Sequence, residues 1–337
     1  MASPRLTHAL DTGAFEAPDG ARVLLLEPAA DADLSPLDQC DITMQQTFKP
    51  AFDAFESQNV NVTEDADTPA DIVHVTLPRS RDLARGLIAK AEQLAAGGTV
   101  MVDGAKTDGA DAMLKAIKSR VEVAGQVAKA HGKLFWFAAN DSFQDWALPE
   151  PARVTDGWIT QPGVFSADGP DAGSVSLVDA VPKNLKGTGA DLGGGWGYLT
   201  KHLLDLPGVT HVDFVEADKR ALTCAALNID DPRASLHWAD ATKWGTAGSL
   251  DWVVMNPPFH TSRTPDAKLG QAFIQSAARL LKPKGRVILV ANRHLPYETT
   301  LAACFVHVQE LDGDSRFKIL HAQQPKPSTP VRRTRRR

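Results

Sequence analysis

The sequence is short of the residues that build disulfide frameworks and metal sites. Its 337 residues include only three cysteines, Cys40, Cys224 and Cys304, which lie far apart and form no Cys-x-x-Cys pair. The ten histidines are scattered without the spacing of metal ligands. Cysteines used in this way argue against a zinc site and fit a reducing compartment. We therefore expect a cytoplasmic protein that holds no metal.

Long apolar runs and an excess of positive charge are also missing. No stretch approaches the roughly 20 apolar residues of a membrane span, and the N-terminus, Met1 to Gly20, does not resemble a signal peptide. The net charge of −5 argues against a generally basic nucleic-acid-binding surface. Five of the last six residues are nevertheless arginine, following a proline-rich stretch. We expect a disordered basic tail over 326–337, which either adds phosphate contacts or is only solvated.

Strand and helix patterns alternate along the C-terminal half of the chain, which favours a mostly parallel sheet covered by helices on both faces. The N-terminal half repeats the plan in weaker form, and a chain of this length exceeds one typical core. We infer a tandem duplication of one α/β fold, a Rossmann-like domain, with the prolines after Trp146 marking the connection. The predicted parts are a first domain over 1–145, a linker over 146–160, a second domain over 161–325 and the tail.

A glycine-rich turn follows the first strand of the second domain and precedes a helix. It reads Asp191-Leu192-Gly193-Gly194-Gly195-Trp196-Gly197. Glycines at 193, 195 and 197 allow a tight turn and a close approach of the backbone to a ligand, although a purely structural turn has the same composition.

Two carboxylates stand at the ends of the next strands. Glu216 comes 23 residues after Gly193, where a carboxylate can accept hydrogen bonds from both hydroxyls of a ribose. Asp240, followed by Ala241, ends the third strand and could bind an adenine amino group. Alone, each is also compatible with an ordinary exposed acid at a strand end.

The most informative motif is Asn256-Pro257-Pro258-Phe259, directly after the apolar run Leu250 to Met255. The two prolines supply no N–H and keep the backbone extended. The Asn256 amide oxygen and the Pro257 carbonyl can then converge on a planar amino group with two N–H donors, and Phe259 can stack on its ring. The motif therefore predicts a site for an exocyclic amine.

Together with Gly163-Val164-Phe165-Ser166 and Asp171-Ala172-Gly173-Ser174, these motifs resemble those of class I methyltransferases that act on exocyclic amines. The likeness is greatest to the bacterial ribosomal RNA guanine-N2 methyltransferases, and it covers nearly the whole chain. It implies two tandem methyltransferase-like domains, the second active with a seven-stranded sheet and the first degenerate. One departure is Trp196, where the family usually has a small residue.

The resemblance also implies the cofactor, S-adenosylmethionine (AdoMet), and its binding residues. These are Phe165, Ser166, Asp171, Gly173, Asp191, Gly193, Gly195, Glu216, Asp240, Ala241 and Asn256. The implied catalytic residues are Asn256, Pro257 and Phe259, and the implied partner is ribosomal RNA, most simply the 16S RNA, or the small ribosomal subunit. We expect a monomer.

The first half lacks both chemical motifs at the corresponding places. Glu27-Pro28-Ala29-Ala30 stands where the glycine turn would be, and Thr76-Leu77-Pro78-Arg79 stands where the second half has Asn256 to Phe259. We therefore expect the first domain to support folding or substrate docking. Arg79, Arg81 and Arg85 are candidates for phosphate contacts, although a solvated helix start explains them more simply.

Three other functions remain to be weighed. Asn-Pro-Pro-aromatic loops also serve methylation of adenine N6 and of protein glutamine. A different class is an RNA-binding pseudoenzyme with two inactive halves, which the complete motif set of the second half disfavours. A nicotinamide dehydrogenase would leave Asn256 to Phe259 without a role, and no catalytic His, Lys or Tyr arrangement supports it.

Overall fold

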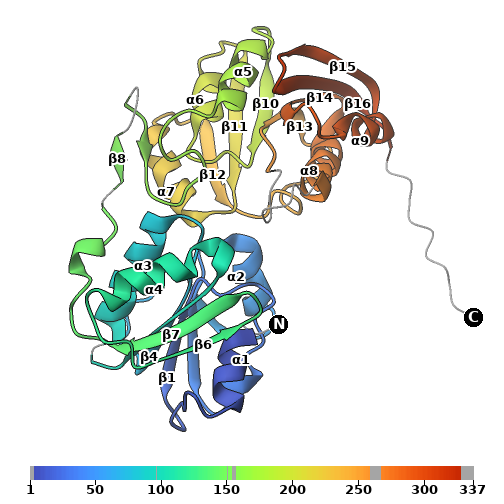
Figure 1. The fold of residues 1–337 in the computed structure, drawn as a ribbon. Coiled ribbons are helices and arrows are strands. Elements are labelled where there is room, and N and C mark those ends of the chain that lie inside the picture. Colours follow the sequence, from blue (N-terminus) through green and yellow to red (C-terminus); the bar gives the residue numbers. More distant parts are fainter. Residues whose placement is uncertain (1–3, 96, 150, 154–156, 259–266, 328–337) are drawn as a thin grey trace, which may run out of the picture. The chain divides into compact units, whose positions relative to one another are not determined.

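The computed structural model describes residues 4–95, 97–149, 151–153, 157–258 and 267–327. Its chain forms two compact units, one made of residues 1–152 and 161–167 and the other of residues 153–160 and 168–337. Each unit is an α/β structure built around a seven-stranded sheet (Figure 1). No described helix has both the length and the apolar character needed to cross a membrane.

The first unit contains the helices and strands between Pro4 and Trp146. Its elements are α1 (Pro4–Asp11), β1 (Arg22–Leu26), η1 (Ser35–Leu37), β2 (Asp41–Gln45), α2 (Lys49–Glu56), β3 (Asn61–Thr63), β4 (Ile72–Thr76), α3 (Arg81–Ala95), β5 (Thr99–Ala105), η2 (Lys106–Asp108), α4 (Ala110–Lys118), β6 (Gly125–Lys129), β7 (Gly132–Ala138) and η3 (Gln144–Trp146).

The second unit contains the same kinds of element. They are α5 (Ala172–Ala180), β10 (Gly187–Leu192), α6 (Tyr198–Leu204), β11 (Val209–Glu216), α7 (Lys219–Asn228), β12 (Ala234–Trp238), β13 (Leu250–Met255), α8 (Ala267–Leu280), β14 (Leu281–Asn292), α9 (Tyr297–Cys304), β15 (Phe305–Gly313) and β16 (Phe317–Pro325), and β8 (Ala152–Arg153) pairs with β9 (Ile159–Thr160) in a separate small sheet.

The two large sheets have one topology. Their strand orders are β3-β2-β1-β4-β5-β7-β6 and β12-β11-β10-β13-β14-β16-β15. In each, the first five strands of the order are parallel and the last two are joined by antiparallel pairing. The predicted fold class, two tandem Rossmann-like domains, is therefore confirmed.

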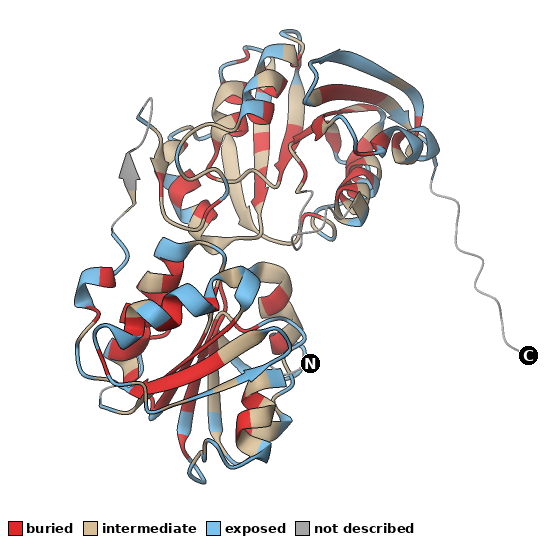
Figure 2. Ribbon diagram, viewed as in Figure 1, coloured by how far each residue is buried: buried red, intermediate tan, exposed pale blue. Residues whose placement is uncertain are grey.

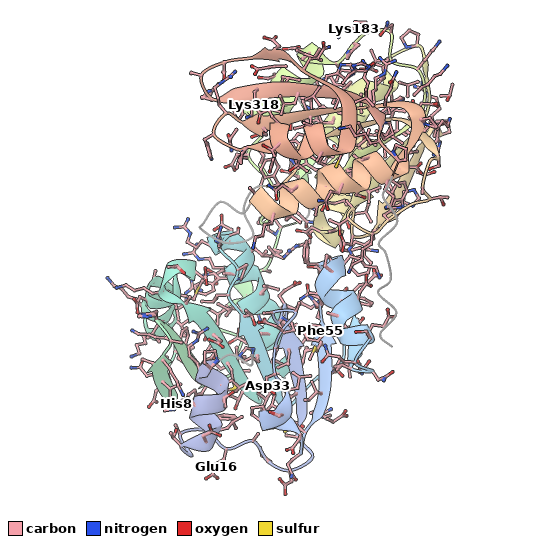
Figure 3. All side chains as sticks on the ribbon, turned by 90° about the vertical axis from the view of Figure 1, so that its right-hand side faces the viewer. His8, Glu16, Asp33, Phe55, Lys183 and Lys318 are labelled. Carbon is pink, nitrogen blue, oxygen red and sulfur yellow. The ribbon has the colours of Figure 1, made fainter. Side chains whose placement is uncertain are left out.

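The strands of each sheet and the helices beside them contain buried residues (Figure 2), and these form apolar clusters on both faces of each sheet. In the second unit, α8 and α9 share one apolar cluster with the sheet, while α5, α6 and α7 share the cluster on the opposite face. Helix α8 buries Phe273, Ile274, Ala277 and Leu280, a helical spacing that gives it one apolar side. In the first unit, α3 and α4 cover one face, and α1 and α2 cover the other, where Phe55 is fully buried (Figure 3).

Some element boundaries differ from those expected. The sequence pattern predicts a helix from Trp196 to Leu206, but α6 begins at Tyr198, because Gly197 has a φ of 98°, outside the range of a right-handed helix. The residues Asp312-Gly313-Asp314 predict a turn between two strands, but the turn falls later, because β15 runs on to Gly313 and β16 begins at Phe317.

The segment predicted as a linker, 146–160, belongs partly to the folded units. Trp146 is buried and packs on Phe143, with ring centroids 4.6 Å apart, and the Arg85 guanidinium lies 5.1 Å from the Trp146 ring centroid. The chain changes unit between residues 152 and 153, and residues 161–167 return to the first unit.

Candidate active site

The glycine turn after β10 has the backbone that its sequence predicts. Gly193, Gly195 and Gly197 have φ values of 73°, 61° and 98°, a region in which residues with a side chain are strained. A Cβ on Gly194 would stand 2.2 Å from the Phe214 ring, so this glycine is needed for packing. A Cβ on Gly195 would meet no atom within 4 Å, so the turn borders open space at this residue.

Asp191 lies beneath the turn and is completely buried. Its Oδ2 accepts a hydrogen bond of 2.8 Å from the Thr200 hydroxyl, while its Oδ1 has no partner among the described residues. Burial raises the pKa of this carboxyl group from 3.8 to about 7, against the smaller opposing effect of Thr200. An unpaired buried carboxylate oxygen is costly, and a polar ligand would relieve that cost.

Glu216 ends β11 beside the same turn. Its Oε2 accepts from the Gly195 N–H at 2.8 Å, and its Oε1 accepts from the N–H groups of Ala217 and Asp218 at 2.7 and 2.8 Å. Desolvation still outweighs these hydrogen bonds and raises the pKa of Glu216 from 4.5 to about 7. The carboxylate thus joins the glycine turn to the end of the next strand.

Asn256 follows β13 and is half-buried. Its Nδ2 donates to Asp171 Oδ2 at 3.0 Å and to Ser174 Oγ at 2.9 Å. Pro257 is buried beside it. A Cβ on Gly193 would lie 4.0 Å from Pro258 Cδ, so the glycine turn and the Asn-Pro-Pro segment are neighbours.

Asp171 is the N-cap of α5, and its Oδ2 also accepts from the Ser174 N–H at 2.9 Å. Gly173 leaves room for this arrangement, because a Cβ there would stand 3.0 Å from Asp171 Oδ2 and 3.3 Å from the Phe317 ring. The start of α5 is therefore fitted closely between Asn256 and β16.

Asp240 and Ala241 follow β12, whose last paired residue, Trp238, lies opposite Glu216. Asp240 Oδ1 accepts from the Thr242 N–H at 2.9 Å and from its hydroxyl at 2.6 Å. Ala241 is buried, and its carbonyl accepts from the Ser276 hydroxyl. Asp240 thus stabilises a local turn at the same edge of the sheet, and its predicted contact with adenine stays a prediction.

The remaining predicted site residues are Phe165, Ser166 and Phe259. Phe165 and Ser166 belong to the segment 161–167, which packs with the first unit; Phe165 is exposed and Ser166 has a φ of 51°. Their predicted role in cofactor binding stays a prediction. Phe259 lies outside the described residues.

Sequence reasoning missed Asn228, at the end of α7. Its Oδ1 accepts from the Ile159 N–H, and its Nδ2 donates to the Ile159 carbonyl, both at 2.8 Å, and to the Trp196 carbonyl at 2.7 Å. One side chain therefore fastens β9 to the glycine turn. A lone asparagine at a helix end gives no sequence signal of this role.

Trp196, the departure from the family pattern, is buried. Its ring centroid lies 5.2 Å from that of Trp158 and 5.8 Å from that of Tyr198. The side chain thus belongs to an aromatic cluster that includes the segment next to β9.

The first unit has different residues at the corresponding positions. In the first unit Leu25 pairs with His74, and in the second unit Asp191 pairs with Val254 at the same place in the sheet. Two residues further along these strands, Glu27 therefore corresponds to Gly193. By the same shift, Thr76 corresponds to Asn256. Leu25 also pairs with Met44 as Asp191 pairs with Phe214, which makes Gln46 the counterpart of Glu216.

These counterparts have side chains with hydrogen-bond partners inside the first unit. Glu27 keeps the left-handed backbone, with a φ of 54°, and its carboxylate accepts from the Thr47 hydroxyl at 2.8 Å. Gln46 is buried and donates to the Pro28 carbonyl at 2.8 Å, where Glu216 instead accepts from Gly195. The strand pairing is the same in both units, while Gly193 and the acid Glu216 of the second unit are replaced by Glu27 and the neutral Gln46 in the first.

Comparison with known proteins identifies the family. Residues 157–321 match the family model described as "Methyltransferase small domain". Two relatives are named "Ribosomal RNA small subunit methyltransferase C". The protein from Hahella chejuensis is 28% identical over 321 residues, covering 89% of this chain and 94% of its own, and that from Idiomarina loihiensis is 27% identical over 266 residues, covering 75% and 78%. The chain belongs to this methyltransferase family.

A solved structure agrees with this assignment over the whole methyltransferase chain. It is titled "T. Thermophilus 16S rRNA N2 G1207 methyltransferase (RsmC) in complex with AdoMet and Guanosine". It matches with a TM-score of 0.80 and 25% identity, covering 95% of this chain and 91% of that one. The two chains therefore share their fold over nearly their whole length.

Proposed function

We propose that this methyltransferase transfers a methyl group from AdoMet to the exocyclic N2 amine of a guanine in 16S ribosomal RNA. The observation that carries the proposal is the Asn256 amide, whose Nδ2 is held by Asp171 and Ser174. This arrangement leaves Oδ1 as the group that can accept a hydrogen bond from a substrate N–H.

The residues around the glycine turn fit AdoMet. The open space beside Gly195 can take the methionine part, and Glu216 stands where a carboxylate can accept from ribose hydroxyls. The unpaired Oδ1 of the buried Asp191 provides a reason for a polar ligand above it. When bound, AdoMet supplies a methyl group on a sulfonium, which is a good leaving group.

The chain's own task is to orient a weak nucleophile. A guanine N2 amine is conjugated with its ring, and it has two N–H donors in one plane. Asn256 Oδ1 and the Pro257 carbonyl can each accept one of them, which directs the nitrogen electron pair out of the ring plane. Asn256 cannot serve as a base, so the proton leaves to water. The target base must be unstacked to enter, and Phe259 is proposed to stack on it.

The remaining assignments follow from this function. We propose that the second domain is catalytic and that the first, which has Glu27 and Gln46 in place of Gly193 and Glu216, docks the substrate or supports folding. We further propose that the chain acts as a monomer and in the cytoplasm, where bacterial ribosomal RNA is processed. Sedimentation of the purified chain tests whether it is a monomer.

The Asn256→Ala variant tests the central assignment. We expect methyl transfer to small ribosomal subunits, followed with labelled AdoMet, to fall by at least about 100-fold, because the variant loses the group that orients the amine. AdoMet affinity, measured by calorimetry, should stay within about threefold of the wild type, since the lost group faces the substrate.

Mass spectrometry of the product separates the alternatives. Methylguanosine in the digested RNA supports the proposal, whereas methyladenosine or methylated glutamine would replace it with one of the other amine substrates. A wild-type chain that binds no AdoMet would favour the pseudoenzyme instead.

A further inference from the structure

We propose that Asp171 is a positioning residue that determines which way the Asn256 amide faces. This inference rests on the proposed function, because it assigns to Asp171 the orientation of the group that meets the substrate amine. The resemblance to the family suggested a different role for Asp171, namely cofactor binding.

An asparagine amide can be turned by 180° with almost no change of shape, so packing alone does not choose between its two orientations. At this site the wrong orientation would present the Asn256 NH2 group to the NH2 group of the substrate. Two donors would then face each other, and neither N–H of the amine would be accepted by the side chain. Something beside Asn256 must therefore favour one orientation.

Asp171 has the required chemistry. An ionised carboxylate only accepts hydrogen bonds, so Oδ2, at 3.0 Å, pairs with Nδ2 and would repel Oδ1. The Ser174 hydroxyl, at 2.9 Å from the same Nδ2, adds a second partner but can either donate or accept. The carboxylate is the group that makes the two orientations unequal.

Asp171 is itself held firmly. Its Oδ2 accepts from the Ser174 N–H at the start of α5, Ser174 is buried, and Leu177 of the same helix is fully buried in the core. Gly173 admits no side chain between Asp171 and Phe317. The carboxylate therefore stands at a fixed place relative to β13, the strand that ends just before Asn256.

The Asp171→Asn variant separates positioning from stability and from cofactor binding. Asparagine is as good an N-cap as aspartate, so α5 should keep its stability. The amide oxygen that keeps the cap on the Ser174 N–H is neutral and holds Asn256 Nδ2 more weakly than the carboxylate does, because both bonds go to the same atom, Oδ2. Turned around, the new amide would donate to Asn256 Oδ1 but give up the cap, so the preference for one orientation is weakened. We expect kcat to fall about 10- to 100-fold, the effect of one charge-assisted hydrogen bond, with the AdoMet Kd within about threefold of the wild type.

A matched control uses the same Asp→Asn substitution at an acid of the first unit that also accepts from a nearby serine. Asp33 accepts from the N–H and hydroxyl of Ser35 in an exposed turn of the first unit, and Asp33→Asn should leave kcat, Kd and thermal stability unchanged. Ser174→Ala should lower kcat less than Asp171→Asn, because the carboxylate remains.

A measurement without turnover keeps the inference independent of the substrate. In protein labelled with 15N-asparagine, the Asn256 side-chain NH2 signal, assigned by its absence from Asn256→Ala, should exchange slowly with solvent in the wild type and much faster in Asp171→Asn. Equal exchange in both proteins would overturn the inference, as would an AdoMet Kd raised tenfold with unchanged kcat, which would make Asp171 a cofactor ligand. Failure of the wild type to methylate guanine would count against the proposed function and leave the exchange result to decide the role of Asp171.

Discussion

At the scale of single residues, the site contains two carboxyl groups whose burial disfavours their ionised form. Asp191 and Glu216 are both desolvated, and the pKa of each is raised to about 7. Their counterparts in the first unit are the neutral Leu25 and Gln46. The first unit is therefore neutral at both of these positions, whereas the second unit, where a cationic nucleoside is proposed to bind, keeps two acids.

The raised pKa of Glu216 predicts how AdoMet affinity depends on pH. An ionised carboxylate accepts better from ribose hydroxyls than a protonated one, so affinity should rise between about pH 6 and 8 as Glu216 loses its proton. Calorimetric titrations across this range measure the effect. Glu216→Gln should bind more weakly at pH 8 and show a flatter profile; an unchanged profile would mean that Glu216 does not titrate on binding.

Asp191 predicts the pH dependence of stability in the absence of ligand. Its pKa is raised from 3.8 to about 7, so between these values the folded chain binds more protons than the unfolded chain. The free energy of unfolding should therefore fall as the pH rises from about 4 to about 7. Asp191→Asn, which carries no titrating group, should lose this part of the slope in urea unfolding curves; a slope equal to that of the wild type would contradict the assignment.

At the scale of elements, the glycine turn is supported from outside its own strand and helix. Asn228 of α7 bonds to the carbonyl of Trp196 in the turn and to both backbone polar groups of Ile159 in β9. Three hydrogen bonds of one side chain therefore link α7, β9 and the glycine turn to one another. A change at the end of α7 should thus reach the cofactor site.

The Asn228→Ala variant tests this link. It leaves buried or half-buried backbone groups unpaired, so the free energy of unfolding should fall by about 1–3 kcal/mol, and AdoMet affinity should weaken with it. Urea unfolding and calorimetry measure the two effects. Thr223→Ala, on the exposed side of the same helix, is the control and should change stability by less than about 0.5 kcal/mol. A loss of stability without any loss of affinity would show that the turn does not depend on Asn228.

The sequence predicted the elements with strong patterns better than the short ones. The sequence pattern predicts strands over 22–26 and 250–255 and a helix over 219–228, and β1, β13 and α7 have these bounds. Continuous apolar strands and a helix that begins after the capping residue Asp218 have clear signals. Helices α5 and α9 were not expected, since eight or nine residues with apolar side chains on several sides show no helical period.

The candidate site was only partly predictable, because some of its contacts join residues far apart in the sequence. The glycine turn and Asn256 stand directly after strands and Glu216 ends one, so parallel topology brings them to one edge of the sheet. The link between Asp171 and Asn256 joins residues 85 positions apart, and the clamp of Asn228 on Ile159 joins residues 69 positions apart. Such contacts depend on how helices pack against the sheet, which spacing along the chain does not reveal.

At the scale of the whole molecule, one topology occurs twice in the chain with different contents. Glu27 and Gln46 put side chains into the first unit at the places where the second has Gly193 and Glu216. The same backbone can therefore serve as a binding fold or as a filled scaffold, depending on a few side chains after the strands.

This difference predicts the stoichiometry of cofactor binding. One AdoMet should bind per chain, and calorimetry of the purified protein measures the ratio. Gly195→Val should abolish binding altogether, because a branched side chain is strained at a φ of 61° and projects into the open space beside the turn. Two bound molecules per chain, or one remaining in Gly195→Val, would mean that the first unit is a binding domain after all.

Because the proposed chemistry is gathered after the strands of the second sheet, the segments that lead into those strands are available for other uses. Residues 246–248, which precede β13, are exposed and contain no proposed site residue. A fluorophore attached at Ala247 after its replacement by cysteine would lie beyond the opposite end of β13 from Asn256, and could report on ribosome encounter while the methylation rate stays intact.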